Sequence, residues 1–461
     1  MRKTKIVATV GPSTTSEEVL ERLLAIVDVV RLNFSHGTQE THAHVFACVK
    51  NMAAHIKKHV AVIGDLCGPK IRTGDLGQGI LLTVGDEVVL VTEGSDDGDI
   101  PISHVQDLSA VAPGDPVLLD DGFLALSALE SRPNRLVCRV VTGGLLKSHK
   151  GVNFPRTCLL QSALTEKDRA AAYFGVDLGL DFFALSFVQR ASDIHALRAI
   201  TGSTPIIAKI ERPVALNNIE EILDAADGIM VARGDLGVEQ GFEFVPAIQK
   251  RLIREARLRA KPVITATQML ESMISNPTPT RAEVSDVANA VLDGTSAVML
   301  SAETAVGAYP LQAVEMMDRI LQTVERDPLF MDIPLALSPP VTDFMQAIAY
   351  AAVLSVEHLD VKRIVVFSNT GQTARELAKY HPPIPIVALT SHREVLARLA
   401  LERGVLPIYC PPMDSPSQML AACDRILKEM GLAVCGDRIA VTLGFESASQ
   451  RTNTLKLHIV Q

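Results

Sequence analysis

The chain has 461 residues, of which 48% are hydrophobic and 21% are charged. This apolar content is enough to bury a core, so a disordered protein is excluded. The 44 basic and 53 acidic residues give a net charge of −9, and no run of basic residues is long enough to grip a nucleic-acid backbone. At about 150 residues per domain, the length predicts roughly three domains, or fewer if one is an α/β barrel.

The distribution of charge and cysteine predicts a soluble, cytoplasmic protein. No uncharged stretch approaches the ~20 apolar residues of a membrane-spanning helix. The basic start precedes only a short apolar run, Ile6–Val10, which is too short for the core of a signal peptide. The seven cysteines form no Cys-x-x-Cys pair and their number is odd, which is typical of a reducing compartment.

Short apolar runs recur along the chain, and most are followed by a segment with helical periodicity. Fully apolar runs of this length are typical of parallel strands that are buried on both faces. Eight such units indicate a TIM (β/α)8 barrel. The predicted strands are Lys5–Val10, Val27–Leu32, Val60–Asp65, Asp181–Ser186, Ile206–Glu211, Gly228–Ala232, Pro262–Ala266 and Ala297–Ser301.

Two parts of the chain depart from this pattern. Residues 68–152 lose helical periodicity and carry strand-like runs between Gly, Pro and Asp turns, which predicts a small β-barrel inserted after the third strand. Its position at the rim of the barrel indicates a lid. Past the prolines near residue 335, a new alternation predicts a separate C-terminal α/β domain, residues 336–461. The barrel itself would comprise residues 1–67 and 153–335.

The elements expected in these two parts follow from the same patterns. In the insert, the predicted strands are Ile80–Val84, Glu87–Val91, Val117–Leu119 and Leu136–Val141. In the C-terminal domain, the predicted helices are Asp343–Glu357, Thr373–Tyr380, Arg393–Leu401 and Ser417–Met430. The predicted strands there are Arg363–Phe367, Ile384–Leu389, Arg438–Leu443 and Leu455–Val460.

Reactive side chains follow the ends of six predicted barrel strands, and such ends meet at one mouth. These residues are Arg31, Asn33, Ser35, His36, Asp65, Lys209, Glu211, Arg233, Gly234, Asp235, Thr267, Ser301 and Glu303. Lys209 and Glu211 lie two residues apart in one strand, so both side chains point into the barrel. With Asp235 from the next strand, Glu211 suits octahedral Mg²⁺ that is completed by water and a substrate phosphate. The alternative for Lys209 and Glu211 is a structural ion pair.

Other mouth residues leave their roles open. The turn Gly234–Gly237 leads into a helical segment whose N–H groups could hold a carboxylate or phosphate, although such turns are more often connectors. Arg31 fits a phosphate clamp or a salt bridge at the rim equally well. His36 could face solvent, bond its own loop or touch a nucleotide.

Some patterns are assigned to structure alone. Thr280-x-x-Glu283 is a capping box that precedes a helix. Five methionines are expected in the core or at an interface: Met269, Met273, Met299, Met316 and Met317.

With these residues in place, the sequence resembles the pyruvate kinase family. The segments that carry the resemblance are Thr4–Pro12, Arg31–Gly37, Gly68–Gly74, Lys150–Asn153, Ala208–Glu211, Met230–Glu239, Thr265–Met273, Pro279–Glu283 and Glu303–Ala305. The likeness spans the chain and is loosest in the lid and the C-terminal domain.

The resemblance implies phosphoryl transfer from phosphoenolpyruvate to ADP, followed by protonation of the enolate to pyruvate. By analogy, Glu211 and Asp235 hold Mg²⁺, with Mn²⁺ as an alternative metal. Lys209 neutralises charge on the transferring oxygens, Arg31 clamps the phosphate, and N–H groups near Gly234 and Asp235 receive the substrate carboxylate.

The proton donor and the nucleotide residues are likewise implied by the resemblance. Thr267 stands where the family has a hydroxyl linked to the proton that reaches the enolate, and we expect a water relay there. Asn33, His36, Arg72 and Lys150 match positions that bind the phosphates and ribose of ADP.

One departure from the family concerns a monovalent cation. Most members have Glu where Lys70 stands and Thr where Leu66 stands, and the acidic version needs K⁺ near Asn33, Ser35 and Asp65. Because Lys70 would bring an ammonium to this region, we expect turnover without K⁺. The alternative is that Lys70 merely faces solvent.

A second departure concerns regulation. Ser368, Asn369, Thr370 and Gly371 form a turn that resembles the family's loop for a sugar-phosphate activator. Gln372 replaces a residue that is commonly basic, so a sugar phosphate and a nucleotide both remain open as effectors. The family likeness also suggests a homotetramer.

Two other functions compete with the enzyme. One is a catalytically silent relative that binds phosphoenolpyruvate as a sensor or scaffold, which is disfavoured because Lys209, Glu211, Asp235 and Thr267 are all present. The other is a Mg²⁺-dependent aldolase barrel, which would not explain the β insert.

Overall fold

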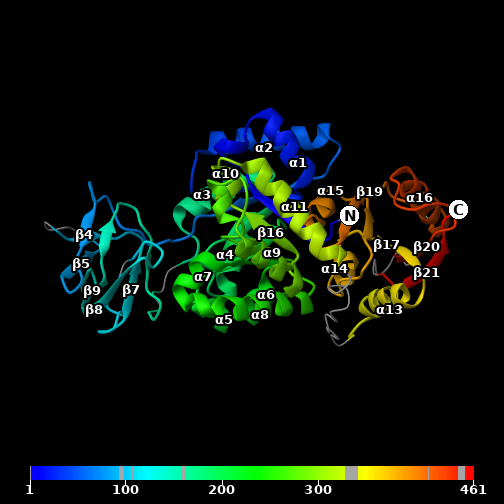
Figure 1. Ribbon diagram of the computed structural model, residues 1–461. Coiled ribbons are helices and arrows are strands. Elements are labelled where there is room, and N and C mark those ends of the chain that lie inside the picture. Colours follow the sequence, from blue (N-terminus) through cyan, green and yellow to red (C-terminus); the bar gives the residue numbers. More distant parts are fainter. Residues whose placement is uncertain are drawn as a thin grey trace.

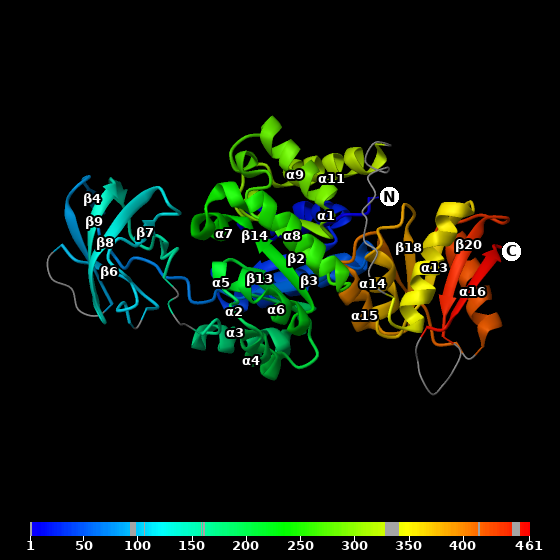
Figure 2. The same cartoon turned by 90° about the horizontal axis from the view of Figure 1, so that it is seen from below.

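The computed structural model describes residues 2–92, 98–105, 107–157, 159, 162–327, 341–413, 415–444 and 452–461. Figure 1 shows three lobes in a row: a lid of β-strands, a central α/β barrel and a C-terminal α/β domain. Figure 2 shows the same order from below, with the lid and the C-terminal domain at opposite ends of the barrel. The predicted boundary near residue 335 lies outside the described residues.

The central lobe is a closed barrel of eight parallel strands, as predicted. Around the barrel their order is β1-β16-β15-β14-β13-β12-β3-β2. The strands are β1 (Lys5–Thr9), β2 (Val29–Asn33), β3 (Ala61–Asp65), β12 (Phe182–Leu185), β13 (Ile206–Ile210), β14 (Gly228–Ala232), β15 (Val263–Ala266) and β16 (Ala297–Leu300).

Helices cover the outside of this barrel. They are α1 (Glu17–Ile26), α2 (Gln39–His55), α3 (Glu166–Leu178), α4 (Ala191–Thr201), α5 (Pro213–Asn217), α6 (Ile219–Ala225), α7 (Arg233–Gln240), α8 (Val245–Leu258), α9 (Arg281–Asp293), α10 (Ala302–Ala305) and α11 (Pro310–Arg326). Three short 3₁₀ helices join them: η1 (Pro12–Thr14), η2 (Phe242–Phe244) and η3 (Glu271–Ile274). The capping box at the start of α9 is confirmed, because Thr280 Oγ1 accepts from Glu283 N and Glu283 Oε2 accepts from Thr280 N.

Two apolar cores share the barrel strands because successive side chains point to opposite faces. Residues such as Ile6, Val30 and Val62 face the helices. Their neighbours fill the barrel interior: Val7, Val29, Ala61, Ile63, Phe182, Ala184, Ile207, Met230, Ile264, Ala266, Ala297 and Met299. The predicted core positions of the methionines are confirmed, with Met269, Met273, Met299 and Met317 buried and Met316 packed against the core.

The lid, predicted as a small β-barrel, is built from a curled six-stranded sheet of order β11-β7-β8-β9-β5-β6 and a two-stranded sheet, β10-β4. Its strands are β4 (Ile80–Leu82), β5 (Glu87–Val91), β6 (Ile100–Pro101), β7 (Pro116–Leu119), β8 (Leu124–Arg132), β9 (Arg135–Thr142), β10 (Gly144–Leu146) and β11 (Val152–Asn153). The long strand β8 was not predicted. Its first five residues alternate buried and half-buried, and it pairs with both β7 and β9.

The C-terminal domain has five strands in the order β19-β18-β17-β20-β21, and only β21 is antiparallel to its neighbour. Its strands are β17 (Val361–Phe367), β18 (Ile386–Thr390), β19 (Val405–Tyr409), β20 (Arg438–Leu443) and β21 (Thr454–Ile459). Its helices are α13 (Phe344–His358), α14 (Gln372–Ala378), α15 (Arg393–Leu399) and α16 (Pro416–Glu429). The sequence prediction missed β19, which contains Pro407. A proline that cannot donate to a ladder is tolerated there because β19 lies at the sheet edge.

The C-terminal domain closes the bottom of the barrel. Ala397, Ala400 and Leu401 at the end of α15 pack against the barrel interior. Nearby, Lys5 Nζ donates to the carbonyl oxygen of Val405 at 2.8 Å, and Gly404 N donates to Lys3 O at 2.9 Å. These contacts fix the lower end of the barrel and leave its carboxyl-terminal mouth on the opposite side.

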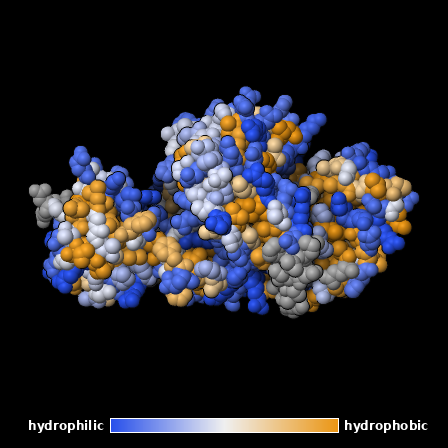
Figure 3. Space-filling model, viewed as in Figure 1, coloured by the Kyte–Doolittle hydropathy of each residue, from blue (hydrophilic) through white to orange (hydrophobic). Residues whose placement is uncertain are grey.

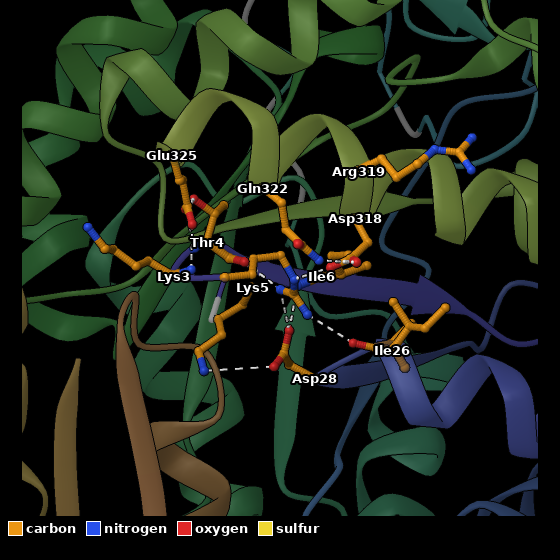
Figure 4. A network of polar contacts seen from close by, with 12 residues as sticks. Lys3, Thr4, Lys5, Ile6, Ile26, Asp28, Asp318, Arg319, Gln322 and Glu325 are labelled. Carbon is orange, nitrogen blue, oxygen red and sulfur yellow. Dashed lines mark hydrogen bonds and ion pairs between the residues drawn. The ribbon is translucent and has the colours of Figure 1, made fainter. Parts of the chain in front are cut away.

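A polar network holds the start of the chain at this lower end (Figure 4). The Asp28 carboxylate accepts from Arg2 at 2.7 Å and from the Ile6 amide at 2.9 Å. Arg2 also donates to Asp318 at 2.9 Å, and Glu325 accepts from the Thr4 amide at 2.7 Å. The network therefore ties β1 to α11.

The surface of the molecule is mixed in polarity. Figure 3 shows hydrophobic areas on the lid and on the C-terminal domain. On the lid, exposed apolar side chains include Leu81, Val84, Phe123 and Leu145. In the part of the chain that the structure describes, no helix is both long and apolar enough to cross a membrane.

Candidate functional site at the barrel mouth

A chain of polar contacts crosses the top of the barrel interior over neighbouring strands. Arg31 on β2 donates to Thr9 Oγ1 on β1 at 3.0 Å and to Asp65 Oδ2 on β3 at 2.6 Å. Lys209 Nζ on β13 lies 3.3 Å from Asp65 Oδ1 and donates to Ser186 Oγ at 2.7 Å. Below them on the same face lie Val7, Val29, Ile63 and Ile207, so at this end of the barrel the polar groups replace the apolar filling.

Lys209 is the centre of this chain. Its ammonium also lies 3.1 Å from Glu211 Oε1, which confirms that the two side chains share a face. Burial alone would lower the pKa of Lys209, but the carboxylates of Asp65 and Glu211 outweigh it and raise the pKa. Lys209 is therefore a fixed positive charge at neutral pH and cannot act as a base.

The acidic partners are deeply buried. Asp65 and Glu211 are each 1% exposed. Burial would raise the pKa of Asp65, but Lys209 and Arg31 lower it, so Asp65 stays ionised. Burial raises the pKa of Glu211 against the attraction of Lys209, and the charge of Asp235 raises it further. Glu211 Oε2 accepts from the Phe187 amide at 2.6 Å, which fixes its orientation.

These carboxylates fit a hard divalent cation. Asp235, in the first turn of α7, is close enough to Glu211 for its charge to raise that group's pKa, and a cation between them would relieve the repulsion. Among the described residues no group of three or more His, Cys, Asp and Glu side chains is arranged to hold a metal. Two carboxylates are what Mg²⁺ uses when water and substrate oxygens supply its other ligands.

Lys70 reaches this same group from the base of the lid. Its Nζ lies 2.7 Å from Asp235 Oδ1, and both side chains are about a quarter exposed. Its ammonium was expected nearer Asn33, Ser35 and Asp65, whereas Asp65 is held by Arg31 and Lys209. The ammonium group of Lys70 therefore contacts the carboxylate of Asp235, which is a predicted metal ligand.

Thr267 lies beside the start of α7. Its hydroxyl accepts from Gly234 N at 2.8 Å, so this amide already has a partner. Thr267 and the following Gln268 have positive φ angles of 69° and 53°, a conformation that non-glycine residues avoid and that is often retained at functional sites. Arg233 holds the turn, because it donates to Thr267 O at 2.7 Å and to Asp286 Oδ1 at 2.7 Å. Arg233 therefore positions Thr267.

The remaining predicted residues lie around this centre. Asn33 ends β2 next to Asp65, and its side-chain oxygen accepts from Ser35 N at 3.2 Å. His36 is exposed in the following turn, and its carbonyl contacts the ring of His42. At the rim of β16, Glu303 is buried and accepts from the amides of Leu270 and Ser301.

Two predicted nucleotide residues belong to the lid connections. The backbone of Arg72 forms a β-bridge with Gly151, and its guanidinium donates to His149 O at 3.0 Å. The two connections therefore run side by side. Lys150 Nζ pairs with Asp120 Oδ1 at 2.8 Å. Both cations therefore lie at the junction of lid and barrel, where a change in lid position would move them.

The predicted effector loop lies in the C-terminal domain, far along the chain from the mouth. Ser368 Oγ accepts from Gly371 N at 2.9 Å, and Gly371 has φ 80° as the cap of α14. The loop is therefore a tight turn that leads into α14.

Sequence reasoning missed two members of the polar chain. Thr9 and Ser186 join Arg31 and Lys209 to the barrel wall, since Thr9 Oγ1 also donates to Leu300 O and Ser186 Oγ to Leu66 O. The signal was available: both lie two residues beyond an interior apolar side chain, Val7 or Ala184, so both face inward.

The fold and the site together define a class. This is a (β/α)8 barrel whose mouth carries a fixed ammonium, a guanidinium and paired carboxylates under a β lid, an arrangement suited to a phosphorylated anion and a divalent cation. Family models agree with this class: "Pyruvate kinase, barrel domain" matches residues 1–314 and "Pyruvate kinase, alpha/beta domain" matches residues 346–458.

Individual relatives give the same result. The chain is 44% identical to a protein named pyruvate kinase from Agrobacterium vitis, over 100% of this chain and 97% of the relative. It is 39% identical to one from Clostridium perfringens, over 99% of both chains. It is 40% identical to one from Mycobacterium tuberculosis, over 99% of this chain and 98% of the relative. The chain belongs to the pyruvate kinase family.

Proposed function

We propose that this member of the family is an active kinase that transfers the phosphoryl group of phosphoenolpyruvate to ADP and protonates the enolate to give pyruvate and ATP. The observation that carries the proposal is the contact chain at the mouth, in which Lys209 lies 3.1 Å from Glu211 and 3.3 Å from Asp65. Burial of such a charge cluster is costly for folding, whereas phosphoryl transfer depends on positioned charge.

Each residue of the cluster has one task in this proposal. Lys209 stays protonated and faces the oxygens on which negative charge grows as the phosphoryl group leaves the enolate. Arg31, held in place by Asp65 and Thr9, presents its remaining donors to the phosphate. The carboxylate of the substrate is received near Gly234 and Asp235 at the start of α7, with the Asp235 amide as its donor because the Gly234 amide already donates to Thr267 Oγ1.

Glu211 and Asp235 would hold the divalent cation. When bound, Mg²⁺, or Mn²⁺ in its place, would supply positive charge that offsets the negative charge of the phosphate oxygens. The protein's own part is to orient the ligands: the Phe187 amide fixes Glu211, and Lys70 contacts Asp235.

Protonation of the enolate is assigned to the side of Thr267. The pKa of a threonine hydroxyl is far too high for it to be a simple acid, so we propose that it orders a water that delivers the proton. Its hydroxyl donates to Ala266 O at 2.6 Å and accepts from Gly234 N, so it would hold this water through its remaining lone pair, and the proton given to the enolate would be replaced from solvent.

Nucleotide binding is assigned to the rim and the lid base. Asn33 ends β2 and His36 follows it, while Arg72 and Lys150 come from the lid connections, so ADP would lie between barrel and lid. Closure of the lid over it would exclude water that could otherwise take the phosphoryl group.

Independence from K⁺ is part of the proposal. Lys70 brings a positive charge to 2.7 Å from Asp235, and this supports a built-in ammonium in place of a monovalent cation at the mouth. The test compares the turnover rate in a buffer whose only monovalent cation is tetramethylammonium with the turnover rate after K⁺ is added. Equal rates are expected, and a collapse that K⁺ restores would refute the idea.

Assembly, location and regulation are proposed at a coarser level. We propose a homotetramer in the cytoplasm, on the family likeness and on the unpaired pattern of cysteines. An effector at Ser368–Gly371, either a sugar phosphate or a nucleotide, is proposed on the turn alone.

The alternative is a silent relative that binds phosphoenolpyruvate as a sensor or scaffold. A coupled assay that follows ATP formation from phosphoenolpyruvate and ADP with Mg²⁺ separates the two. Turnover at typical enzyme rates, about 1 to 1,000 per second, supports the kinase. Binding of phosphoenolpyruvate without ATP formation would favour the sensor.

A further inference from the structure

A cavity lies where the lid joins the barrel, lined by residues of both. Its volume is about 120 Å³, which is room for several water-sized groups. One wall comes from the lid connections, with Ile71 and Val152, and the other from the barrel, with Gln189, Arg212 and Glu239. The cavity is therefore lined by both the lid and the barrel, whose relative position changes when the lid moves.

Two donors at this cavity have no partner. Gln189 is 2% exposed, and its amide Nε2 makes no hydrogen bond within the described residues. The Nε of Arg212 is also buried and unpaired there, while its guanidinium lies over the Phe187 ring with 5.2 Å to the ring centre. Buried donors normally have partners, so two unpaired ones at one cavity indicate an acceptor that belongs between them.

The other walls restrict what that acceptor can be. Ile71, Val152 and Phe154 make much of the lining apolar, which favours a short aliphatic body. The Glu239 carboxylate, held by Asn153 Nδ2 at 2.7 Å, offsets one of the two lining cations, Arg156 and Arg212, so the remaining positive charge suits a singly charged anion. A single negative charge on a planar group suits a guanidinium and an amide donor best.

We propose that this cavity is a binding site for a small aliphatic monocarboxylate, and that an occupant favours the lid position seen here because it contacts both walls. The carboxylate would accept from Gln189 and Arg212, and the aliphatic body would lie against the lid base. The site is separate from the phosphate and metal groups at the mouth, and the inference goes beyond the proposed catalytic function.

The probe for this site is isobutyrate. Its binding to the full-length protein is measured by calorimetry in the presence of Mg²⁺ and phosphoenolpyruvate, without nucleotide. The mouth is then filled and no turnover is needed, so the result does not depend on catalysis. Gln189→Leu removes the amide and keeps the size of the side chain. We expect binding to weaken about tenfold or more, the usual effect of losing a hydrogen bond to a charged group.

Controls keep the proposal open to refutation. Exposed Gln39→Leu on α2 should bind as the wild type does, and Gln189→Leu should keep the wild-type kcat. If Gln189→Leu does not fold, Arg212→Met tests the second donor. Amide hydrogen exchange at residues 71–73 and 152–154 should slow with isobutyrate in the wild type and not in Gln189→Leu.

Three results would overturn the proposal. The first is no isobutyrate binding by the wild type, and the second is equal binding by wild type, Gln189→Leu and Arg212→Met. The third is preference for inorganic phosphate over isobutyrate at the same concentration, since this would mean that the cavity takes a more highly charged anion.

Discussion

Replacement of Lys209 by methionine tests the centre of the site. The substitution keeps the length of the side chain and removes the ammonium that contacts Ser186, Asp65 and Glu211. Loss of one preorganised charge-stabilising group costs on the order of 3 kcal/mol in the transition state, so kcat should fall about 10²-fold or more. Binding of Mg²⁺ should largely survive because Glu211 and Asp235 remain.

The same change also has a cost in folding, which must be measured separately. Asp65 and Glu211, each 1% exposed, would lose a cation, and breaking a buried pair typically costs about 3 to 5 kcal/mol. Arg31 still contacts Asp65 at 2.6 Å, so the lower end of that range is expected. Urea unfolding gives the free energy of unfolding, and the coupled assay well below the transition gives kcat.

The matched control is Lys50→Met. Lys50 contacts Asp181 at 2.5 Å but is 31% exposed and lies on α2, outside the barrel. The loss of such a pair should cost about 1 kcal/mol or less and leave kcat unchanged. If Lys209→Met kept near-normal kcat while its unfolding free energy fell, Lys209 would be structural and the proposed mechanism wrong.

Three further predictions follow from other parts of the molecule. Lys70→Glu places a carboxylate beside Asp235, so turnover should become dependent on added K⁺. The measurement is kcat as a function of K⁺ concentration. A variant that keeps the wild-type rate in tetramethylammonium would contradict this prediction. Burial raises the pKa of Glu402 from 4.5 to about 7, so the folded state binds its proton more tightly, and stability is lost as pH rises between these values. Glu402→Gln should therefore raise the unfolding free energy by at most about 3 kcal/mol at pH 8 and change it little near pH 4.5. An equal change at the two pH values would show that the pH dependence does not come from the Glu402 charge. Asp28→Asn removes the carboxylate that contacts Arg2 and Lys5, so the free energy of unfolding in urea should fall by about 3 kcal/mol while kcat is retained. A fall in kcat without a loss of stability would contradict this prediction.

The barrel could be predicted because its signal is local. Each parallel strand is buried on both faces, so each is a continuous apolar run that ends at a turn. The C-terminal sheet was harder because its edge strand β19 is half-buried and contains Pro407. The lid strand β8 mixes Leu and Ala with Ser and Glu, and only its pairing with two neighbours identifies it as a strand.

The site could be predicted by residue type but not by pairing. Strand alternation places Lys209 and Glu211 on one face, and the structure confirms their contact. Which carboxylate holds Lys70 depends on how the lid connection crosses the rim, and this path has no signature in the sequence. The Gly234 amide looked available from its turn, yet Thr267, 33 residues away, takes it.

The position of the charges within the barrel is the strongest argument that they serve function. The interior below them is filled by Val7, Val29, Ile63 and Ile207, and continuing that filling upward would avoid the cost of buried charges. Instead, the layer at the carboxyl end holds Arg31, Asp65 and Lys209. The opposite end also buries a charge, but there Lys5 lies 3.7 Å from Asp28 and donates to the carbonyl oxygen of Val405, so it joins the C-terminal domain to the barrel. The charges at the mouth contact one another and lie where the strand termini, the lid and the solvent meet, which is the end of a (β/α)8 barrel that carries the chemistry.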